Sequence, residues 1–382
     1  MQNYTEWANS IWQKIEKKMA AVAPRSKNKI PNSTFDGVHD DWSSEEKITM
    51  WTNGFWPGLM WLMYEGTKNP IYKEVAEIAE ASLDEAFAQY ENLIHDVGFM
   101  WHIASGANYR LTGDEMSKVR NLTAASILFS RFNLRGNYIR AWNGGGGVHG
   151  EGKYDSNIGW SIIDCMMNLP LLYWASKEIG DPRFTYIAEA HADTTMDTHI
   201  RPDGSVRHIV VHDEVNGGMI DELYGQGYAT GSSWSRGQSW ALYGFVLSYI
   251  HTGKEAYLNA AKRVAHYFIS CVCDDYLPKC DFRSPKEPII YDSTAGAIAA
   301  CGLIEIAKAV PEFERSIYMD AAVNILKALE EKFCNWDEDY DSILQMGTSA
   351  YSGQNHHLNL IYGDFYFVEA ILKLKGSDFL IW

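Results

Sequence analysis

Six stretches of the chain share one pattern, in which a glycine stands at or near the start of a long apolar and aromatic segment. These stretches begin near Gly54, Gly98, Gly159, Gly237, Gly296 and Gly363. Most are followed by a turn and a segment with apolar residues at helical spacing and charges between them, over 71–89, 116–129, 184–195, 257–269 and 315–332. A helix that is apolar on all sides belongs in the interior, whereas an amphipathic helix belongs at the surface. The pattern therefore predicts an inner ring of helices inside an outer ring.

Two architectures fit such helix pairs: a closed, all-α (α/α)6 barrel and an open solenoid of stacked pairs. The repeats start at uneven intervals, and the extra length falls in loops before the inner helices. Those loops would line one mouth of a closed ring, where a binding site belongs. We therefore predict an (α/α)6 barrel. Since no linker or low-complexity segment interrupts the chain, we expect one domain over residues 1–382.

Two long insertions should contribute to that mouth. The first, 134–158, contains Trp142 and a run of four glycines that begins at Gly144. The second, 204–236, contains a segment with alternating character that predicts a short strand or hairpin, with His208 and His212 on one face. Neither histidine has a carboxylate or cysteine at metal-ligand spacing, so we expect them to bond a substrate rather than a metal.

Two aspartates stand out as candidate acid and base groups. The inner segment from Trp160 to Trp174 is expected to be helical, and Asp164 is its only charged residue. A carboxyl group there must find a partner or keep its proton, and one with a raised pKa can act as a general acid. The alternative is a structural aspartate that caps a helix, and for Asp96 an N-cap is the simple interpretation. Two carboxylates at neighbouring helix starts favour acid–base chemistry on a sugar.

Aromatic residues surround the candidate cation of the site. Trp234 and Trp240 flank Arg236, the side-chain type best suited to hold a carboxylate by two hydrogen bonds. The alternative is an arginine stacked between aromatic rings for structural reasons. The chain has 14 Trp and 22 Tyr, which suit a site that stacks sugar rings, although core packing accounts for most of them.

The charge and the cysteines exclude other classes of partner. The formal net charge of −16 argues against binding to nucleic acid or to an anionic membrane surface. No apolar run reaches the length of a membrane span, and the first residues lack the pattern of a signal peptide. Cys271, Cys273 and Cys280 lack zinc spacing, so reduced thiols in a cytoplasmic protein are expected. We expect neither a metal nor a cofactor.

The motifs around these residues resemble those of the unsaturated glucuronyl hydrolases, glycoside hydrolase family 88, from about Trp51 to Leu374. The resemblance is carried by His95-Asp-Val-Gly-Phe99, Ile162-Ile-Asp-Cys-Met-Met-Asn-Leu-Pro-Leu-Leu172, Trp234-Ser-Arg-Gly-Gln-Ser-Trp240, Asp292-Ser-Thr-Ala-Gly-Ala-Ile-Ala-Ala-Cys-Gly302 and Gly363-Asp-Phe-Tyr-Phe367. It implies an (α/α)6 barrel that removes a Δ4,5-unsaturated glucuronic acid from the non-reducing end of oligosaccharides left by polysaccharide lyases, of the glycosaminoglycan type. In this family an aspartate protonates C4, water adds at C5, and the resulting hemiketal rearranges to release the sugar.

The resemblance also implies residue roles. It makes Asp164 the general acid and base and Asp96 the second essential carboxylate. The implied substrate contacts are Trp51, His95, Phe99, Trp142, His208, Gln226, Trp234, Arg236 and Trp240. Two departures are visible. A histidine that some members carry before the Gln-Gly pair is Gly225 here, which leaves one contact open. Ser349 and Ser352 match a Ser-x-x-Ser-x-Lys stretch of members that accept sulfated disaccharides, but Gln354 replaces the lysine, so the preference for sulfate stays open.

Two other functions compete with this expectation. The first is an unsaturated rhamnogalacturonyl hydrolase, which would use the same ring and chemistry on pectin fragments and is disfavoured by the long motifs. The second is a toroidal sugar-binding protein without catalysis. Loss of the ultraviolet absorbance of the C4=C5 bond would separate catalysis from binding. The expected partner is a small unsaturated oligosaccharide, and the expected assembly is a monomer or weak homodimer.

Overall fold

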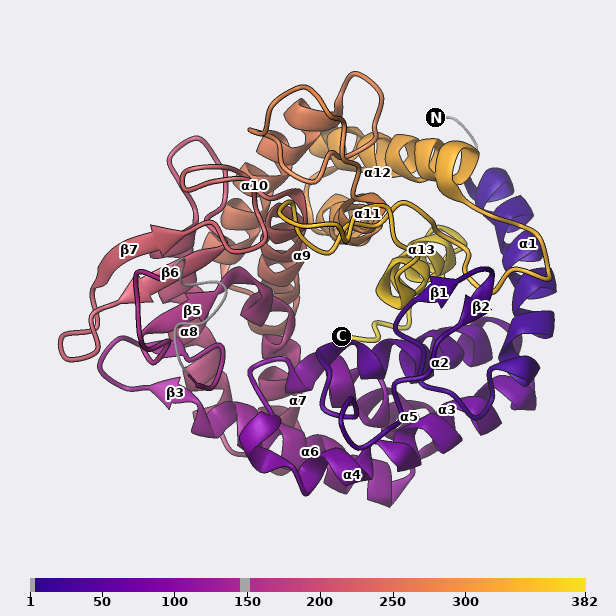
Figure 1. The fold of residues 1–382 in the computed structure, drawn as a ribbon, viewed down its shortest axis with the longest axis horizontal. Helices are drawn as coiled ribbons and strands as arrows, with labels where there is room; N and C mark the ends of the chain where they lie inside the picture. The colour runs from indigo at the N-terminus through magenta and orange to yellow at the C-terminus, as the bar shows by residue number, and fades with distance from the viewer. Residues whose placement is uncertain (1–3, 145–151) are drawn as a thin grey trace.

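Two concentric layers of helices form a ring in the computed structural model, which describes residues 4–144 and 152–382 (Figure 1). The inner layer consists of α2 (Phe55–Thr67), α5 (Ser105–Thr112), α7 (Leu169–Ile179), α9 (Ser235–Thr252), α11 (Ser293–Ala309) and α13 (Ile361–Leu374). The outer layer consists of α1 (Tyr4–Arg25), α3 (Pro70–Ser82), α6 (Glu115–Ser130), α8 (Arg183–His199), α10 (Glu255–Val272) and α12 (Glu312–Phe333). A short helix, α4 (Asp84–Phe87), follows α3. The predicted (α/α)6 barrel is confirmed.

The ring is closed because its last inner helix packs against its first. Helix α13 contacts α2, whereas the ends of an open solenoid would lie apart. The outer partner of α13 is α1, so the two ends of the chain complete one helix pair (Figure 1). Helix α1 buries Ala8, Ile11, Ile15, Met19 and Val22, which recur at helical spacing. The sequence analysis did not predict this helix.

Burial separates the two layers as the sequence pattern predicts. Helix α11 of the inner layer buries every residue from Ser293 to Ala307. Helix α10 of the outer layer buries a stripe that includes Tyr257, Ala261, Val264 and Phe268, and leaves its charged residues outside this stripe. The apolar inner helices therefore form the wall that surrounds the centre of the ring.

The expected helix over Trp160–Trp174 is wrong in its first half. Residues Trp160–Ile162 form strand β5, Ile163–Met167 form a 3-10 turn, and α7 begins only at Leu169. Pro170 lies in the first turn of α7, where its missing N–H costs nothing, but its ring prevents the helix from extending further back. The preceding residues pair instead with β6 (Ile209–His212), which leaves Asp164 on the 3-10 turn.

Short strands accompany the loops at the mouth. The largest sheet has the order β5-β6-β7, all antiparallel, with β7 at Met219–Leu223. This confirms the strand expected in the second insertion. Two hairpins are formed by β1 (Thr34–Phe35) with β2 (Val38–His39) and by β3 (Phe132–Asn133) with β4 (Tyr138–Ile139).

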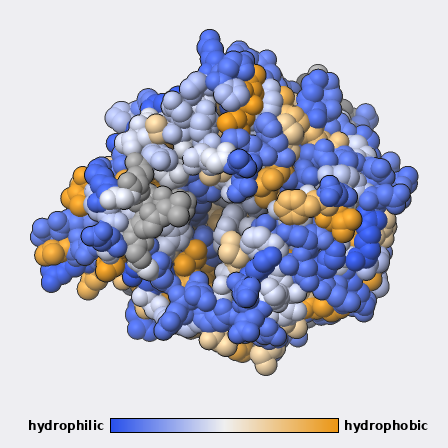
Figure 2. All heavy atoms as spheres, viewed as in Figure 1, coloured by the Kyte–Doolittle hydropathy of each residue, from blue (hydrophilic) through white to orange (hydrophobic). Residues whose placement is uncertain are grey.

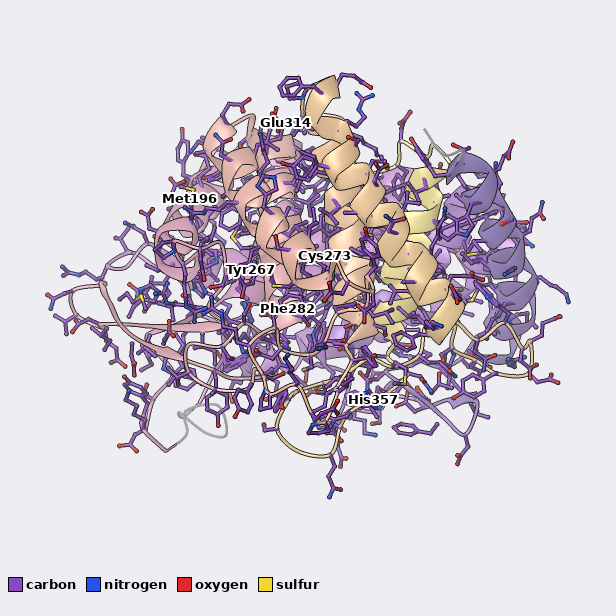
Figure 3. The ribbon with its side chains drawn as sticks, turned by 90° about the horizontal axis from the view of Figure 1, so that it is seen from above. Met196, Tyr267, Cys273, Phe282, Glu314 and His357 are labelled. Carbon is purple, nitrogen blue, oxygen red and sulfur yellow. The ribbon has the colours of Figure 1, made fainter. Side chains whose placement is uncertain are left out.

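The loops and strands gather at one end of the barrel. Seen from above, they lie at the end that carries His357, and Glu314 lies at the opposite end (Figure 3). The face with the loops is mostly hydrophilic and is hollowed near its centre, over the opening of the ring (Figure 2). Each inner helix is preceded by a loop or turn of irregular structure, which before α13 spans 334–360, so the starts of the inner helices converge on this hollow. Among the helices of the described residues, none combines the length and apolar character needed to cross a membrane.

Candidate active site

Asp164 lies on the 3-10 turn at the start of the third inner segment. Its neighbours Ile163, Cys165, Met166 and Met167 are buried, and its own side chain is 18% exposed. Burial raises the pKa of Asp164 to about 7, while the charge of Arg236 and the Trp240 side chain favour the ionised form. The atom Oδ1 has no hydrogen-bond partner within the described part of the chain. At neutral pH this carboxyl is poised between its acid and its base form.

Asp96 lies at the start of the neighbouring inner segment and is 6% exposed. Its Oδ1 accepts a hydrogen bond of 3.2 Å from Asn168 Nδ2 and lies 3.4 Å from His95 Nε2. Burial raises the pKa of Asp96 well above its ordinary value, and the negative charge of Asp164 raises it further. The two carboxyls are therefore close enough to influence each other's ionisation, as expected from their place at adjacent helix starts.

The structure does not support the capping interpretation of either aspartate. The turn Gly98–His102 is preceded by Val97 and has no side-chain cap, and the turn that contains Asp164 also lacks one. Both carboxyl groups are thus available for chemistry rather than for the ends of these helices.

His208 lies beside Asp164, with 3.6 Å between Nε2 and Asp164 Oδ1. The backbone N–H of Gln226 donates to His208 Nδ1 at 3.0 Å. Nδ1 also lies 3.3 Å from Tyr224 O, which can only accept. However, the shorter contact with the Gln226 amide, which can only donate, favours Nδ1 as the acceptor and places the ring hydrogen of neutral His208 on Nε2, on the side of Asp164. The imidazole is thereby held as a donor next to the candidate acid.

Gly225 is required for this arrangement. Its φ is +56°, and a Cβ at this position would lie 2.2 Å from His208 Nδ1. A side chain in this slot would displace the imidazole or open the loop. The glycine that departs from the family pattern at this position therefore leaves the space that the His208 ring occupies.

His212 does not lie beside Asp164 as His208 does. Its Nε2 lies 2.9 Å from Ser161 Oγ, and its ring stacks on Tyr138 with centroids 4.2 Å apart. Ser161 pairs with Val210, so His212 lies on the same side of β6 as Val210, and the extra residue of the irregular pairing between β6 and β7 is Ile220 on β7. His212 belongs to a buried network outside the site.

Aromatic rings form one wall of the site. The ring of Phe99 lies 5.4 Å from that of Trp51 and 5.2 Å from that of Trp240. Phe99 and Trp240 are buried, whereas Trp51 is partly exposed. The Trp234 ring lies 4.3 Å from the His208 ring. Among these rings only that of Trp51 keeps exposed surface on which a sugar ring could stack, and the buried rings pack behind it.

Trp142 lies on the first insertion and contacts the edge of Trp160, with centroids 6.1 Å apart. Its loop is anchored near the second aspartate, because His95 N donates to Ala141 O at 3.1 Å. Of the glycine run that follows it, Gly145, Gly146 and Gly147 lie outside the described residues.

Arg236 is engaged by the protein itself. It is 1% exposed, and Nη1 forms an ion pair of 2.6 Å with Asp292 Oδ2. Nη1 also donates to Thr348 O, and Nη2 donates to Ser349 O at 2.6 Å. Its guanidinium lies 4.6 Å from the centroid of the Trp234 ring. These contacts match the structural alternative for Arg236, although its charge still acts on Asp164.

The loop that contains Ser349 and Ser352 is tied to the same place. Gln226 Nε2 donates to Ser349 O at 2.7 Å, and Tyr351 N donates to Gln226 O at 2.8 Å. Ser352 is exposed on this loop. The fold thus brings Gln226, Arg236 and Ser349 together, as expected, but through backbone carbonyls of the loop.

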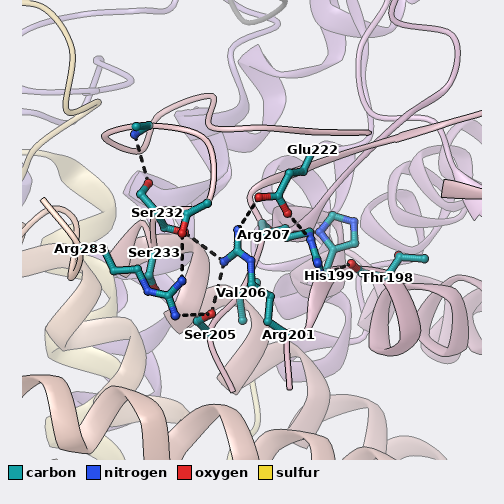
Figure 4. Close-up of polar contacts among 12 residues, drawn as sticks. Thr198, His199, Arg201, Ser205, Val206, Arg207, Glu222, Ser232, Ser233 and Arg283 are labelled. Atoms are coloured by element: carbon teal, nitrogen blue, oxygen red, sulfur yellow. Dashed lines mark hydrogen bonds and ion pairs between the residues drawn. The ribbon is translucent and has the colours of Figure 1, made fainter. Parts of the chain in front are cut away.

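An ion network that the sequence did not predict supports the second insertion (Figure 4). Glu222 accepts from Arg201 Nη2 at 3.0 Å and from Arg207 Nε. Arg201 also donates to Ser232 O at 3.0 Å, and Arg283 donates to Ser205 Oγ at 3.0 Å. These contacts join β7 to the segment that leads to Trp234, and so they fix the loop that carries Gln226.

Two residues at the site were missed by sequence reasoning. Asn168 joins the segments of Asp96 and Asp164, and Asp292 pairs with Arg236. Both residues lie inside the motifs that carry the family resemblance, and this position could have identified them from the sequence. Among the described residues, no group of three or more His, Cys, Asp or Glu is placed to hold a metal ion.

Comparisons with known proteins agree on one group of enzymes. No protein-family model matches the chain. The chain is 37% identical to an unsaturated glucuronyl hydrolase of Bacillus sp. (strain GL1) over 340 residues, which cover 87% of this chain and 88% of the relative. It is 33% identical to an unsaturated chondroitin disaccharide hydrolase of Streptococcus pneumoniae (strain ATCC BAA-255 / R6), over 92% of this chain and 87% of the relative.

Solved structures show the same similarity. The crystal structure of an unsaturated glucuronyl hydrolase from Bacillus sp. GL1, described as responsible for the degradation of glycosaminoglycan, superposes with a TM-score of 0.87 at 33% identity. The match covers 96% of this chain and 97% of that one. A mutant enzyme of Streptococcus agalactiae complexed with dGlcA-GalNAc6S superposes with a TM-score of 0.82 at 25% identity, over 99% of this chain and 94% of that one.

Proposed function

Because the chain belongs to the family of unsaturated glucuronyl hydrolases, we propose that it removes a Δ4,5-unsaturated glucuronic acid from the non-reducing end of small lyase-generated oligosaccharides. The observation that carries this proposal is the pair of buried carboxyls, Asp96 and Asp164, at adjacent inner-helix starts beside an aromatic wall. The substrate is of the glycosaminoglycan type, as in the relatives. We also assign the chain to glycoside hydrolase family 88.

Asp164 is the proposed general acid and base. A carboxyl with a pKa of about 7 holds a proton at neutral pH and can still lose it. It donates this proton to C4 of the vinyl ether, and positive charge develops at C5 and the ring oxygen. The Asp164 carboxylate then takes a proton from a water molecule as the water oxygen bonds to C5. The hemiketal formed in this way opens and releases the sugar.

The groups around Asp164 stabilise the carboxylate that this step creates. The Nε2 hydrogen of His208, the Trp240 side chain and the charge of Arg236 all favour ionised Asp164. They are in place before the reaction, so they need no reorganisation as the charge appears.

Asp96 is the proposed second carboxylate, and it binds the sugar and stabilises positive charge on its ring. Trp51 would stack on the sugar, with Phe99 and Trp240 packed behind it, and His95, Trp142 and Gln226 would contact its polar groups. Arg236 is proposed to act on the uronate through its charge and through the loop that it holds. Ser349 and Ser352 would meet the neighbouring sugar, where Gln354 supplies no positive charge for a sulfate.

Location and assembly belong to the same proposal. All six cysteines are free, which is typical of a reducing compartment and supports a cytoplasmic location. The net charge of −16 supports the absence of nucleic-acid and membrane partners. We expect a monomer or weak homodimer.

The test is turnover of defined lyase digests. Purified protein is mixed with lyase products of chondroitin, hyaluronan, heparin, gellan and rhamnogalacturonan, and loss of the C4=C5 absorbance is followed. Loss with glucuronic acid products supports the proposal, and loss with the rhamnogalacturonan product alone would favour the pectin alternative. Binding without any loss of absorbance would favour the non-catalytic alternative.

A further inference from the structure

Asn168 joins the two inner segments that carry the carboxyl groups. It lies between the 3-10 turn of Asp164 and the first residue of α7, and it is completely buried. Its side chain contacts three groups of the site: the Phe99 amide, the Asp96 carboxyl and the Asp164 carbonyl. A buried amide with this set of partners links residues that are far apart in the sequence.

The orientation of this amide is fixed by its partners. Phe99 N–H can only donate, so the atom that it meets at 2.9 Å must be the side-chain oxygen of Asn168. The nitrogen Nδ2 therefore lies on the other side. It donates to Asp96 Oδ1 at 3.2 Å and to Asp164 O at 3.3 Å. A flipped amide would place an oxygen against two oxygens and lose all three bonds.

The approach of the two segments depends on Gly98. A Cβ at this position would lie 2.6 Å from Asn168 Oδ1 and 2.9 Å from its Cα. The glycine after His95-Asp-Val is thus the residue that lets the amide reach between Asp96 and Phe99. The contact is built by two motifs together rather than by one loop.

The two carboxyls have different hydrogen-bond environments. Asp96 Oδ1 receives the Asn168 donor, whereas Asp164 Oδ1 has no hydrogen-bond partner among the residues that the structure describes. Two neighbouring carboxyls in a buried site resist double ionisation, so one proton is shared between them. The Asn168 amide favours ionised Asp96, as the Trp240 side chain and its own backbone amide favour ionised Asp164, so the loss of Asn168 would move the shared proton toward Asp96.

We propose that Asn168 is a positioning residue that favours the ionised form of Asp96 and so keeps the shared proton available to Asp164. This inference rests on the proposed function, because it assigns the acid role to Asp164. It adds a residue whose side chain acts through Asp96 rather than by touching the substrate. Without it, burial and the charge of Asp164 would draw the proton to Asp96.

The other groups around Asp96 cannot replace this donor. His95 lies beside it, but burial keeps the pKa of His95 well below its ordinary value, so this ring is neutral. Arg131, directly after α6, favours ionised Asp96 from a distance, and its guanidinium is bonded to backbone carbonyls and to an asparagine. Asp164 opposes the ionisation, and the Cys165 thiol stays protonated because burial raises its pKa.

The experiment replaces Asn168 by leucine, which has a similar size and no donor. The pKa of Asp96 should rise, and the acidic limb of the kcat/KM profile should move to higher pH by roughly one to two pH units, the range for a hydrogen bond to a charged group. kcat near neutral pH should fall while KM changes little. Asn168→Ala tests the same loss in a variant without added bulk, in case the leucine does not fold.

A matched control is available farther along the inner segment of Asp96, on α5. Asn108 Nδ2 donates to the buried carboxylate of Glu80 at 2.7 Å, so Asn108→Leu removes the same kind of bond outside the site. It should lower thermal stability and leave both limbs of the pH profile in place. If the limb of both Asn168 variants also stays in place, the amide is structural and the proposal is overturned.

Ionisation can also be read without turnover. Infrared difference spectra of the carboxyl band, recorded against Asp96→Asn in an Asp164→Asn background, report the titration of Asp96 directly. An upward shift on adding Asn168→Leu supports the role of Asn168, and no shift overturns it. Absence of turnover in the wild-type protein would instead overturn the proposed function, so the two failures are distinguishable.

Discussion

Replacing Asp164 by asparagine should abolish turnover and at the same time stabilise the protein at alkaline pH. Burial raises the pKa of this carboxyl from 3.8 to about 7, so the folded state binds its proton more tightly than the unfolded chain does. The stability that this group contributes is full below about pH 4 and is lost as the pH rises through 7. Above pH 7 the wild-type protein holds an unfavourable charge that asparagine would remove.

The magnitude follows from the two pKa values. They differ by about three pH units, and each pH unit is worth about 1.4 kcal/mol, which gives an upper value of about 4 kcal/mol. The side chain is 18% exposed, so water relieves part of the penalty. We expect a gain in unfolding free energy of about 2–4 kcal/mol at pH 8 and of less than about 1 kcal/mol at pH 4.

The assay is urea unfolding at pH 4, 6 and 8, followed by tryptophan fluorescence and by the loss of helical circular dichroism. Turnover of an unsaturated disaccharide is measured on the same preparations. Loss of the general acid should lower kcat by at least about 10²–10⁴-fold. A gain in stability that is absent at pH 8, or equal at all three pH values, would refute the assignment of Asp164 as a buried protonated acid.

Asp364 provides a contrasting control. Burial raises its pKa to about 7 as well, but its two oxygens accept from Ile343 N at 3.0 Å and Leu344 N at 2.7 Å. Asparagine can accept only one of these bonds, so Asp364→Asn should destabilise the protein by about 1–3 kcal/mol. The two aspartates have a similar pKa, but their replacement by asparagine should change stability in opposite directions, because their hydrogen bonds differ.

Three further variants test the remaining roles. Asp96→Asn should lose most turnover while it retains substrate binding and thermal stability, and a loss of stability without a selective rate defect would indicate a structural residue. Arg236→Ala should raise KM about 10–150-fold, the range for a lost charge-assisted contact. It should also lower the melting temperature, because it leaves a buried carboxylate unpaired. Arg236→Lys should recover only part of the affinity and of the stability, and an unchanged KM would show that the substrate anion is held elsewhere. Gly225→Ala should lower kcat/KM at least about tenfold by displacing the adjacent imidazole of His208. The control is Gly180→Ala, at a position with φ of +71° and open space around its Cβ, which should cost only the left-handed backbone strain of roughly 1–2 kcal/mol in stability. Equal activities of the two variants would contradict the role of the loop that contains Gly225.

The ring was predictable because its signal is local. An apolar segment followed by an amphipathic one reports which helix is inside, and burial in α10 and α11 follows that pattern closely. The place of α1 was not predicted, although Ile11, Ile15 and Met19 recur at helical spacing. Its partner α13 lies at the other end of the chain, and no local pattern reveals such a pairing.

The site was predictable in its carboxyls and less so in its supporting contacts. Asp96 and Asp164 lie at adjacent starts of inner segments, as the repeat pattern indicates. The partner of Arg236 is Asp292, 56 residues away, and a guanidinium that already has such a partner cannot be recognised from the aromatic residues that flank it. The partners of His212 are Ser161 on β5 and Tyr138 on β4, and these long-range contacts are also invisible in the local pattern.

The break in the expected helix explains why Asp164 can serve as an acid. A carboxyl at the first turn of a helix meets free backbone N–H groups and a positive dipole end, and both hold it ionised. Helix α7 begins at Leu169, five positions beyond Asp164, and the intervening 3-10 turn leaves the carboxyl with only its own amide among backbone donors. Pro170 and the pairing of β5 with β6 set this boundary, and β6 begins directly after His208. The same local structure therefore withholds the donors that would ionise the acid early and places the imidazole that stabilises its carboxylate once the proton has left.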